Sequence, residues 1–324
     1  MRKRIAYFVQ NYRPESEAVS KEVKILSDSF NSSVFDMSFR NPLNYPRLLR
    51  LPFLSRDISH IYTSLGDRPY LTLLRRKPII LTGSSSARKG KIESQLRYYS
   101  KLSMVVVESE RQRSILYELG VDDDKIKLIY PGINLDEFSH KPSLTEGFTV
   151  LFASSPPREE LFDSRGINLL LSLAGEEKSL RFIFLWRKTC YDLLRRKIEG
   201  MQLSNVEVVN EIVGDMNEYY AKANCTITPF MNYDDHKPVP RSLIESLAAG
   251  KPVLVSNRVG ISNMIEEERC GVVFEPDPES LIKAVSELRS KYKTYQKNTG
   301  KPAEKYFSKK GFITSYEELY KEIS

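Results

Sequence analysis

The sequence predicts an α/β protein made of two Rossmann-like domains, and three observations indicate this fold class. Short apolar runs, typical of strands buried on both faces, alternate with helical segments along the whole chain. The 324 residues are enough for two domains of ordinary size. A polar stretch at 139–147, which contains Pro142 and Gly147, is typical of a linker. We therefore expect domains at 1–140 and 141–302.

The first half contains six apolar runs that we expect to be parallel strands. A helix is expected from about Glu17 to Phe30, and a second helix begins after Ser109, which forms a capping box with Gln112, and ends at Gly120. The expected strands are Ile5–Val9, Ser33–Met37, Ile58–Thr63, Pro78–Thr82, Met104–Val107 and Ile126–Tyr130.

Ligands of such sheets bind outside the carboxyl ends of the strands, so the loops after Val9, Thr63 and Thr82 are candidate binding loops. Tyr12 lies in the first of them. The third contains Ser84 and Ser85, whose backbone N–H groups and hydroxyls are suited to an anionic group. The three loops are therefore expected to receive one substrate.

The second half repeats the alternation. Its expected strands are Phe148–Ala153, Leu180–Leu185, Val206–Val209, Cys225–Thr228 and Val253–Val255. Helices are expected from Ile167 to about Gly175, from Met216 to Ala223, and from Pro240 or Arg241 to a stop at Gly250. Trp186 follows the second of these strands, where it either packs against a ligand or seals the core. The last helix is expected from about Gly311 to Ile323.

Composition excludes several classes of protein. Hydrophobic content of 41% and charged content of 28% are those of a globular protein, and no apolar run approaches the roughly 18 residues of a transmembrane helix. The basic start is followed by an apolar run too short for a signal peptide. Three distant cysteines indicate reduced thiols of a cytosolic protein, and the acidic run Asp122–Asp124 is expected to be a solvated turn instead of a metal site.

The net charge of +7 lies entirely in the first half. Residues 1–140 hold 23 basic and 16 acidic residues, and the remainder holds 26 of each. Such a basic half suggests an anionic partner. Residues 45–56 mix bulky apolar side chains with arginines, which favours either a segment that touches an anionic membrane or a partly buried crossover with exposed arginines.

The start of the helix near Pro240 is chemically the most interesting feature. The backbone N–H groups of Ser242 and Leu243 are expected to be free at a positively polarised helix end, which suits a diphosphate. Glu245, one turn further on, is placed to accept hydrogen bonds from sugar hydroxyls. The alternative is an ordinary solvated ion pair between Arg241 and Glu245.

The stretch from Arg241 to Glu279 resembles the donor segment of retaining GT-B glycosyltransferases of the family-four, or glycosyltransferase group 1, type. In that family an acidic residue, seven residues and a glutamate precede small residues, Gly-x-Pro and a Val-rich strand. Glu245 takes the place of the second glutamate, and Lys237 takes the place of the first. The resemblance is fair at 126–138 and 149–174, and weak before residue 126.

The resemblance implies a GT-B fold in which two Rossmann-like domains face a cleft and a terminal helix, here 303–324, returns to the first domain. It implies transfer of a sugar, with retention, from a nucleotide-diphosphate sugar to a hydroxyl of a lipid-linked, glycan or small-molecule acceptor, without a metal or other cofactor. Tyr12, Ser84 and Ser85 then lie on the acceptor side. The implied donor-binding residues are Arg158, Arg165, Gly166, Glu211, Ile212, Arg241, Ser242, Leu243 and Glu245.

Lys237 departs from the family pattern, since a lysine cannot stabilise a cationic sugar ring as a carboxylate would. It is suited instead to a donor phosphate or an acidic sugar, and Asp234 or Asp235 of the same loop would then supply the carboxylate. We take Lys237 and Asp235 as the catalytic candidates. The family usually carries a histidine after the fourth strand; this chain has none there, and His60 and His236 are interpreted as packed or surface residues.

Other classes remain open. The chain could be a weak or inactive GT-B homologue that acts as a partner subunit or binding module, or a GT-B sugar-nucleotide epimerase, which would need acid–base side chains. The pI near 9.1 raises nucleic-acid binding, but no standard recognition motif is present. We expect no nucleic-acid partner, and a cytoplasmic protein that is peripheral at the membrane if residues 45–56 bind lipid.

Overall fold

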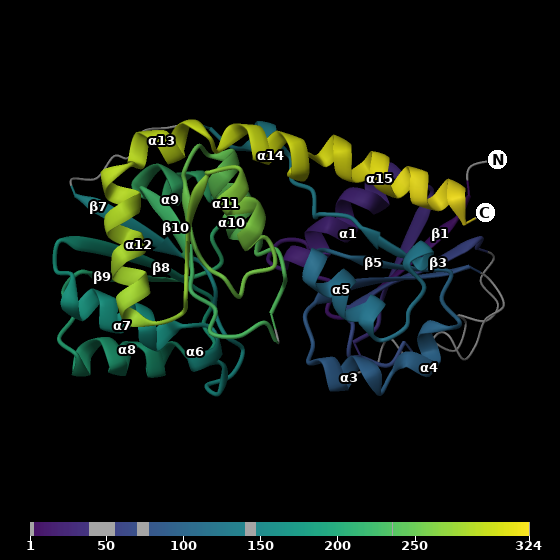
Figure 1. Ribbon diagram of the computed structural model, residues 1–324, viewed down its shortest axis with the longest axis horizontal. Coiled ribbons are helices and arrows are strands. Elements are labelled where there is room, and N and C mark those ends of the chain that lie inside the picture. The colour runs from purple at the N-terminus through teal and green to yellow at the C-terminus, as the bar shows by residue number, and fades with distance from the viewer. Residues whose placement is uncertain (1–2, 39–55, 70–77, 140–146, 235, 324) are drawn as a thin grey trace. The chain divides into compact units, whose positions relative to one another are not determined.

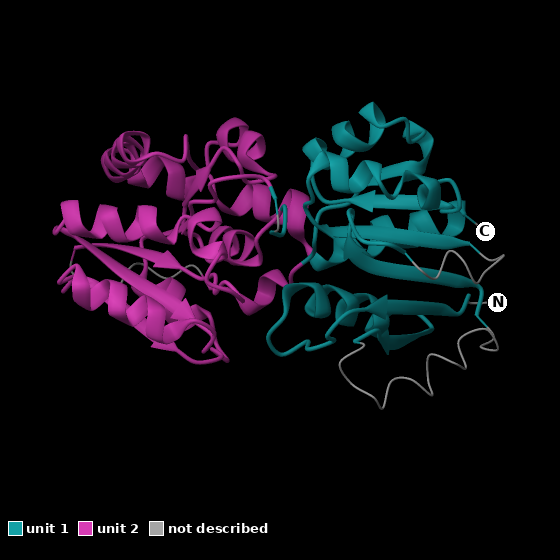
Figure 2. Cartoon of the chain, turned by 90° about the horizontal axis from the view of Figure 1, so that it is seen from below, with its two compact units in different colours: residues 1–132, 234–238, 309–324 teal, residues 133–233, 239–308 magenta. Residues whose placement is uncertain are grey.

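The computed structural model describes residues 3–38, 56–69, 78–139, 147–234 and 236–323. The chain forms two compact units. Unit 1 contains residues 1–132, 234–238 and 309–324, and unit 2 contains residues 133–233 and 239–308 (Figure 2). The chain thus leaves unit 2 for five residues before it enters the helix that the sequence singled out, a detour that no sequence pattern indicated.

Unit 1 is built on a six-stranded parallel sheet of order β2-β1-β3-β4-β5-β6. Figure 1 labels β1, β3 and β5 of this sheet. Each strand matches an apolar run of the sequence to within a few residues. The alternation of side chains in β1 shows why both faces are apolar, because Tyr7 and Val9 pack on one face and Ala6 and Phe8 on the other. The strands are β1 (Ile5–Val9), β2 (Ser32–Asp36), β3 (Ile58–Ser64), β4 (Ile79–Ser85), β5 (Met104–Val107) and β6 (Ile126–Leu128).

Helices cover both faces of this sheet. On one face lie α1 (Ala18–Ser29) and the C-terminal helix α15 (Lys309–Glu322), and on the other lie α3 (Lys89–Glu93), α4 (Leu96–Tyr99) and α5 (Glu110–Glu118). Ser109 caps α5 as expected, because its hydroxyl accepts a hydrogen bond from the N–H of Gln112. The terminal helix belongs to unit 1, which confirms the expected return.

A buried polar network holds α15 on the sheet. The two ring nitrogens of His60 lie 2.8 Å from the Tyr320 hydroxyl and 2.7 Å from Oγ1 of Thr82, and that oxygen lies 3.1 Å from the Tyr316 hydroxyl. Burial lowers the pKa of His60 to about 3, so the imidazole is neutral. His60 is therefore a packed residue, as interpreted from the sequence.

Unit 2 repeats the architecture with a parallel sheet of order β12-β11-β10-β7-β8-β9. Five of its six strands are the expected apolar runs: β7 (Phe148–Phe152), β8 (Leu180–Trp186), β9 (Val206–Asn210), β10 (Cys225–Thr228) and β11 (Val253–Ser256). The sixth, β12 (Gly271–Phe274), was not predicted as a strand.

The helices of unit 2 also lie on both faces. The larger core joins one face of the sheet to α7 (Ile167–Glu176), α8 (Tyr191–Gly200) and α12 (Pro278–Ser290), and a smaller core joins the other face to α9 (Asn217–Lys222) and the end of α10 (Arg241–Ala248). Gly250 follows α10 with φ of +74°, as the expected helix stop requires. The remaining helices are α6 (Leu161–Ser164), α11 (Ser262–Glu267), α13 (Tyr292–Lys297) and α14 (Gly300–Phe307).

The structure also shows where Trp186 lies and whether any described helix could cross a membrane. Trp186 is fully buried in the larger core of unit 2, and its indole N–H donates to the carbonyl of Thr189, so it seals the core. No helix among the described residues combines the length and apolarity that a membrane crossing requires.

Candidate functional site

The carboxyl edge of the unit 2 sheet collects most of the predicted donor residues, because the carboxyl ends of parallel strands meet at one edge. The loop after β7 leads to Arg158, Arg165 and Gly166, β9 ends immediately before Glu211, and the chain after β10 leads towards α10. Side chains far apart in the sequence can therefore meet a single ligand there.

Arg165 lies at the middle of this edge. Its guanidinium donates to Oγ of Ser154, which follows β7, and its Cζ atom lies 5.2 Å from the centre of the Phe230 ring, which follows β10. Because β7 and β10 are adjacent strands, these contacts hold the cation over the carboxyl ends of both. The side chain remains partly exposed, so it keeps access for a ligand.

Gly166 is required by the backbone beside Arg165. It has φ of +70° and immediately precedes α7, and a Cβ atom at this position would lie 2.0 Å from the carbonyl oxygen of Pro229. The amide N–H of Met231 also donates to the carbonyl of Ser164. The glycine thus allows the loop after β10 to pack directly on the segment that carries Arg165.

The first turn of α10 holds a buried charged cluster. Nε of Arg241 lies 2.6 Å from Oε1 of Glu245, and the Tyr220 hydroxyl donates to Oε2 of Glu245 at 3.0 Å and to the carbonyl of Ser242 at 3.2 Å. The ion pair between Arg241 and Glu245 therefore forms, as the alternative expected. It is not solvated, because only 13% and 6% of the two side chains are exposed. Within the described chain, Nη1 of Arg241 has no hydrogen-bond partner.

The backbone at this helix start differs in one respect from the expectation of two free N–H groups. The N–H of Leu243 donates to the carbonyl of Pro240 at 3.1 Å, so the first turn itself uses that donor. No side chain caps α10 among the described residues. The N–H of Ser242, next to the guanidinium of Arg241, is therefore the stronger backbone candidate for an anion.

Three other predicted donor residues have exposed side chains. The side chains of Arg158 and Glu211 are exposed, and 55% of Ile212 is exposed. Their roles as donor ligands stay predictions.

The predicted acceptor residues lie in unit 1. Tyr12 is partly exposed and packs against the core beneath α1 and α15. Ser84 is buried and its hydroxyl donates to the carbonyl of Thr63, while the carbonyl of Ser85 accepts from the Gln112 amide. The Ser84 hydroxyl is therefore already used inside the unit, and Ser85 keeps the more accessible side chain of the two.

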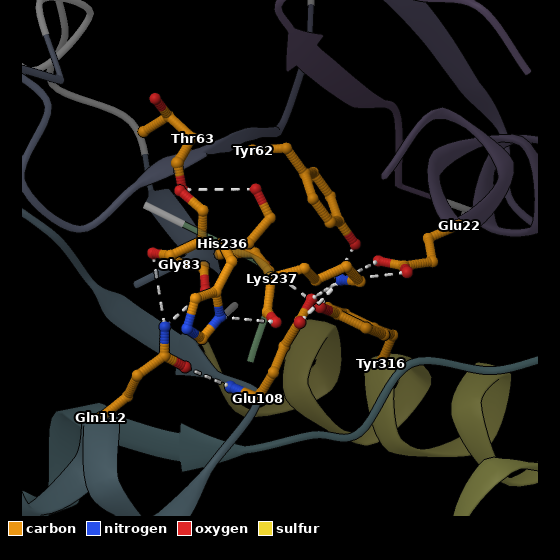
Figure 3. Close-up of polar contacts among 12 residues, drawn as sticks. Glu22, Tyr62, Thr63, Gly83, Glu108, Gln112, His236, Lys237 and Tyr316 are labelled. Carbon is orange, nitrogen blue, oxygen red and sulfur yellow. Dashed lines mark hydrogen bonds and ion pairs between the residues drawn. The ribbon is translucent and has the colours of Figure 1, made fainter. Parts of the chain in front are cut away.

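Lys237 lies among carboxylates in unit 1. Its Nζ atom is 2.5 Å and 2.6 Å from the two carboxylate oxygens of Glu108 and 3.1 Å from Oε1 of Glu22 (Figure 3). Burial alone would lower the pKa of Lys237, but the two carboxylates outweigh it and the pKa is raised. Burial raises the pKa of Glu108 to about 8 against the opposing effect of Lys237.

These partners alter how Lys237 can be used. Its ammonium is engaged inside unit 1, so a donor phosphate would have to replace Glu22 or Glu108, and its catalytic assignment stays a prediction. Asp235 lies outside the described residues. Asp234 pairs with Arg88 at 3.4 Å, and His236 is buried, with Nδ1 3.2 Å from the Lys237 carbonyl.

Three functional candidates were missed from the sequence: Glu22, Glu108 and Tyr220. A weak signal existed for Glu108, since an acidic residue directly follows the apolar run Met104–Val107 at a strand's carboxyl end. Glu22 and Tyr220 lie within helices whose pattern does not distinguish them from neighbouring polar or aromatic positions.

Two other predictions concern surfaces and metals. Of residues 45–56, only Arg56 is described, and it is buried, with its guanidinium 4.7 Å from the Phe8 ring centre and 5.7 Å from that of Phe35. Arg56 is therefore a core residue instead of a lipid contact, and the rest of that segment lies outside the described residues.

In the described ranges, no three His, Cys, Asp or Glu side chains are grouped as a metal site would require.

Comparison with known proteins finds sequence similarity to glycosyltransferases. A family model described as glycosyl transferases group 1 matches residues 165–291. An uncharacterised glycosyltransferase of Methanocaldococcus jannaschii is 23% identical over 268 residues, which cover 74% of this chain and 63% of that protein. The chain thus spans under two thirds of that curated relative.

Solved structures match the fold over nearly the whole chain. HepE of Anabaena, crystallised with UDP, has a TM-score of 0.79 and 14% identity over 98% of this chain and 100% of that one. Sucrose-phosphate synthase of Thermosynechococcus elongatus has a TM-score of 0.78 and 16% identity, with 99% of each chain covered. A glycosyltransferase of Rickettsia africae has a TM-score of 0.76 and 16% identity over 99% and 98%. These similarities confirm the GT-B fold.

Proposed function

From the premise that residues 165–291 form a group 1 glycosyl transferase domain within a GT-B fold, we propose that the protein is a glycosyltransferase. It takes a sugar from a nucleotide-diphosphate donor and transfers it to a hydroxyl group of a glycan, lipid-linked or small-molecule acceptor. The anomeric configuration is retained, and no metal ion takes part.

The observation that carries this proposal is the pair of cationic features at one sheet edge of unit 2. Arg165 is held over the ends of β7 and β10, and Arg241 has a buried guanidinium nitrogen beside the uncapped first turn of α10. Arginine forks and helix N-termini both bind phosphate oxygens. The leaving group of the reaction is a nucleoside diphosphate, whose negative charge grows as the glycosidic bond breaks.

Such donors lower the barrier only if they are already in place when charge develops. A single preorganised donor contributes on the order of 3 kcal/mol to stabilising the transition state. Protein-borne cations would therefore supply the charge that a metal ion supplies in other transferases. Attack by the acceptor on the face that the diphosphate leaves would also let the diphosphate accept the proton, so no protein base is required.

We assign Glu245 as the ribose ligand. Its two carboxylate oxygens are oriented by Arg241 and Tyr220, and each can accept a further hydrogen bond from a hydroxyl. The nucleobase would then lie near Glu211 and Ile212 at the end of β9, where backbone groups contact it. Since HepE was crystallised with UDP, uridine donors are the first to test.

A panel of UDP-, GDP-, ADP- and CMP-sugars tests the function directly. We expect one class to raise the melting temperature and to be consumed when acceptor is supplied, with retention visible in the product by NMR. The Glu245→Ala variant should bind that donor about ten to a hundred times more weakly, the equivalent of a lost charged hydrogen bond. Exposed Glu199→Ala on α8 is the matched control, and the proposal fails if no nucleotide sugar binds the wild-type protein.

One observation favours a second candidate, a GT-B homologue that binds donors without transferring sugar. Lys237 stands where the resembled family has a glutamate, and its charge is engaged by buried carboxylates. This candidate predicts normal nucleotide-sugar affinity with neither hydrolysis nor transfer for any acceptor.

We place the reaction in the cytoplasm, because Cys190, Cys225 and Cys270 are free thiols, as expected of a protein in a reducing compartment. Contact with a membrane surface would depend on residues 45–55, since Arg56 is engaged in the core. Binding to vesicles that contain anionic lipid, compared with neutral vesicles, distinguishes a peripheral protein from one that never meets lipid.

A further inference from the structure

Residues 234 and 236–238 contact the rest of unit 1 at three points. The carbonyl of His236 accepts from the N–H of Ser86 at 2.9 Å, Asp234 pairs with Arg88, and Lys237 lies between Glu22 and Glu108. Figure 3 shows the Lys237 nitrogen with a carboxylate on either side. These contacts come from α1, from the loop after β4 and from the residue after β5, so the segment is fixed from several directions.

The charges of this cluster explain why residue 237 is a lysine. Only 2% of the Glu22 and Glu108 side chains is exposed, and two buried carboxylates this close repel each other unless a cation or a proton lies between them. A glutamate at position 237 would remove the cation and add a third carboxyl group. The lysine is therefore matched to its two partners in unit 1 and is not an isolated departure from the family pattern.

The Glu108 side of the cluster is itself rigid. Its backbone N–H donates to the Gln112 side chain at 2.9 Å, and the Gln112 amide donates to the carbonyl of Gly83 at 3.0 Å. Glu108 is thus tied to α5 and to β4 before it binds Lys237. A fully connected buried network of this kind holds its members in one arrangement.

The anchored lysine is separated from α10 by only Pro238, Val239 and Pro240. The two prolines fix φ and Val239 is fully buried, so these three residues have few conformations available. The carbonyl of Pro240 accepts from the N–H of Leu243, which connects this leader directly to the first helical turn. A restraint at Lys237 is therefore transmitted along the chain to Arg241 and Ser242.

We propose that Lys237 is a positioning residue, held by Glu108 and Glu22 as a charge-matched anchor that sets the first turn of α10 for the donor diphosphate. Lys237 would then contact neither the phosphate nor the sugar. This inference rests on the proposed function for its substrate, but the anchor itself is a property of the fold.

Hydrogen–deuterium exchange tests the anchor without any ligand. In Lys237→Met we expect faster exchange of the amides of residues 241–245 than in the wild type, and a rate near that of the wild type in Lys237→Arg. The double variant Glu108→Lys with Lys237→Glu keeps the charge count of the cluster and should restore protection that Lys237→Glu alone loses. Exposed Lys222→Met on α9 is the control for loss of a lysine from the surface.

Donor titration then connects the anchor to binding. Lys237→Met should weaken the affinity for the nucleotide sugar by at least tenfold and raise KM more than it lowers kcat, while Lys237→Arg and the charge-swapped pair recover both. Lys237→Met with unchanged exchange in α10 and unchanged affinity would overturn the anchor. Absence of nucleotide-sugar binding in the wild type, with the exchange effect present, would instead overturn the proposed function alone.

Discussion

Glu245 shows how single residues set the chemistry of the candidate site. A carboxylate that is almost wholly buried is tolerated there because Arg241 and the Tyr220 hydroxyl each satisfy one oxygen. Desolvation and the neighbouring carboxylate raise the pKa of Tyr220 well above its usual range, so the phenol always carries the proton that it donates. Orientation of Glu245 therefore depends on a residue 25 positions away in the chain.

A prediction about stability follows from removal of the Tyr220 hydroxyl. Tyr220→Phe should lower the free energy of unfolding by about 1–3 kcal/mol, because a buried carboxylate oxygen and the carbonyl of Ser242 each lose a donor. Urea denaturation measures the change. Tyr117→Phe removes the hydroxyl of an exposed tyrosine and should change the stability little, and equal losses in both variants would contradict the role of Tyr220.

Glu108 leads to a prediction about pH. Burial raises its pKa from 4.5 to about 8, so between these values the cluster of Glu22, Glu108 and Lys237 holds one proton that the unfolded chain releases, which leaves one carboxylate charge beside the lysine. The free energy of unfolding should therefore fall as the pH rises from about 5 to about 8, by at most about 1.4 kcal/mol per pH unit. The raised pKa of Lys237 adds no slope there, because this lysine is protonated in both states.

Comparison of urea denaturation in wild type and Glu108→Gln isolates this slope, which should disappear in the variant. The other polar groups around the cluster, Tyr62 and Tyr316, have raised pKa values and do not titrate in this range. Exposed Glu110→Gln is the control and should keep the slope. An unchanged pH dependence in Glu108→Gln would show that the proton resides elsewhere.

At the scale of elements, the loop from β7 to α7 is held in place by a glycine. Gly166→Ala should lower the free energy of unfolding by about 1 kcal/mol for the positive φ, and by more for the contact of its Cβ with the Pro229 carbonyl. Because Arg165 precedes it, donor affinity should fall as well. Gly200→Ala, where a Cβ meets nothing within 4 Å, is the matched control, and thermal unfolding of the two variants decides the point.

Elements were predictable because their signals are local. The capping side chain of Ser109, the positive φ of Gly250 and the apolar runs of the parallel strands all act within a few residues. The use of the Leu243 N–H by Pro240 was not predictable, since it depends on the detailed geometry of the first turn. Ends of strands such as β4, which continues to Ser85, likewise depend on pairing with neighbours.

At the scale of the whole molecule, the sequence predicted the two-unit GT-B fold and the return of the terminal helix. It did not predict that residues 234–238 belong to unit 1, because the partners of Lys237 lie 215 and 129 positions away and only the folded chain brings them together. The candidate site was likewise predictable only where its residues are close together in the sequence. Residues next to a motif, such as Arg241 and Glu245, were found, whereas partners contributed by other elements, such as Tyr220, were not.

The central claim is that Arg165 and the first turn of α10 bind the diphosphate of the donor. Titration calorimetry with the nucleoside diphosphate of the donor class that the sugar-nucleotide panel identifies, and with the matching nucleoside, tests it most directly. We expect Arg165→Ala to weaken binding of the nucleoside diphosphate about ten to a hundredfold and to leave nucleoside binding unchanged, because only the phosphate contacts are removed. Arg195→Ala, which removes an exposed arginine of α8, should bind both ligands as the wild type does. An Arg165→Ala protein that binds that nucleoside diphosphate with wild-type affinity would contradict the claim.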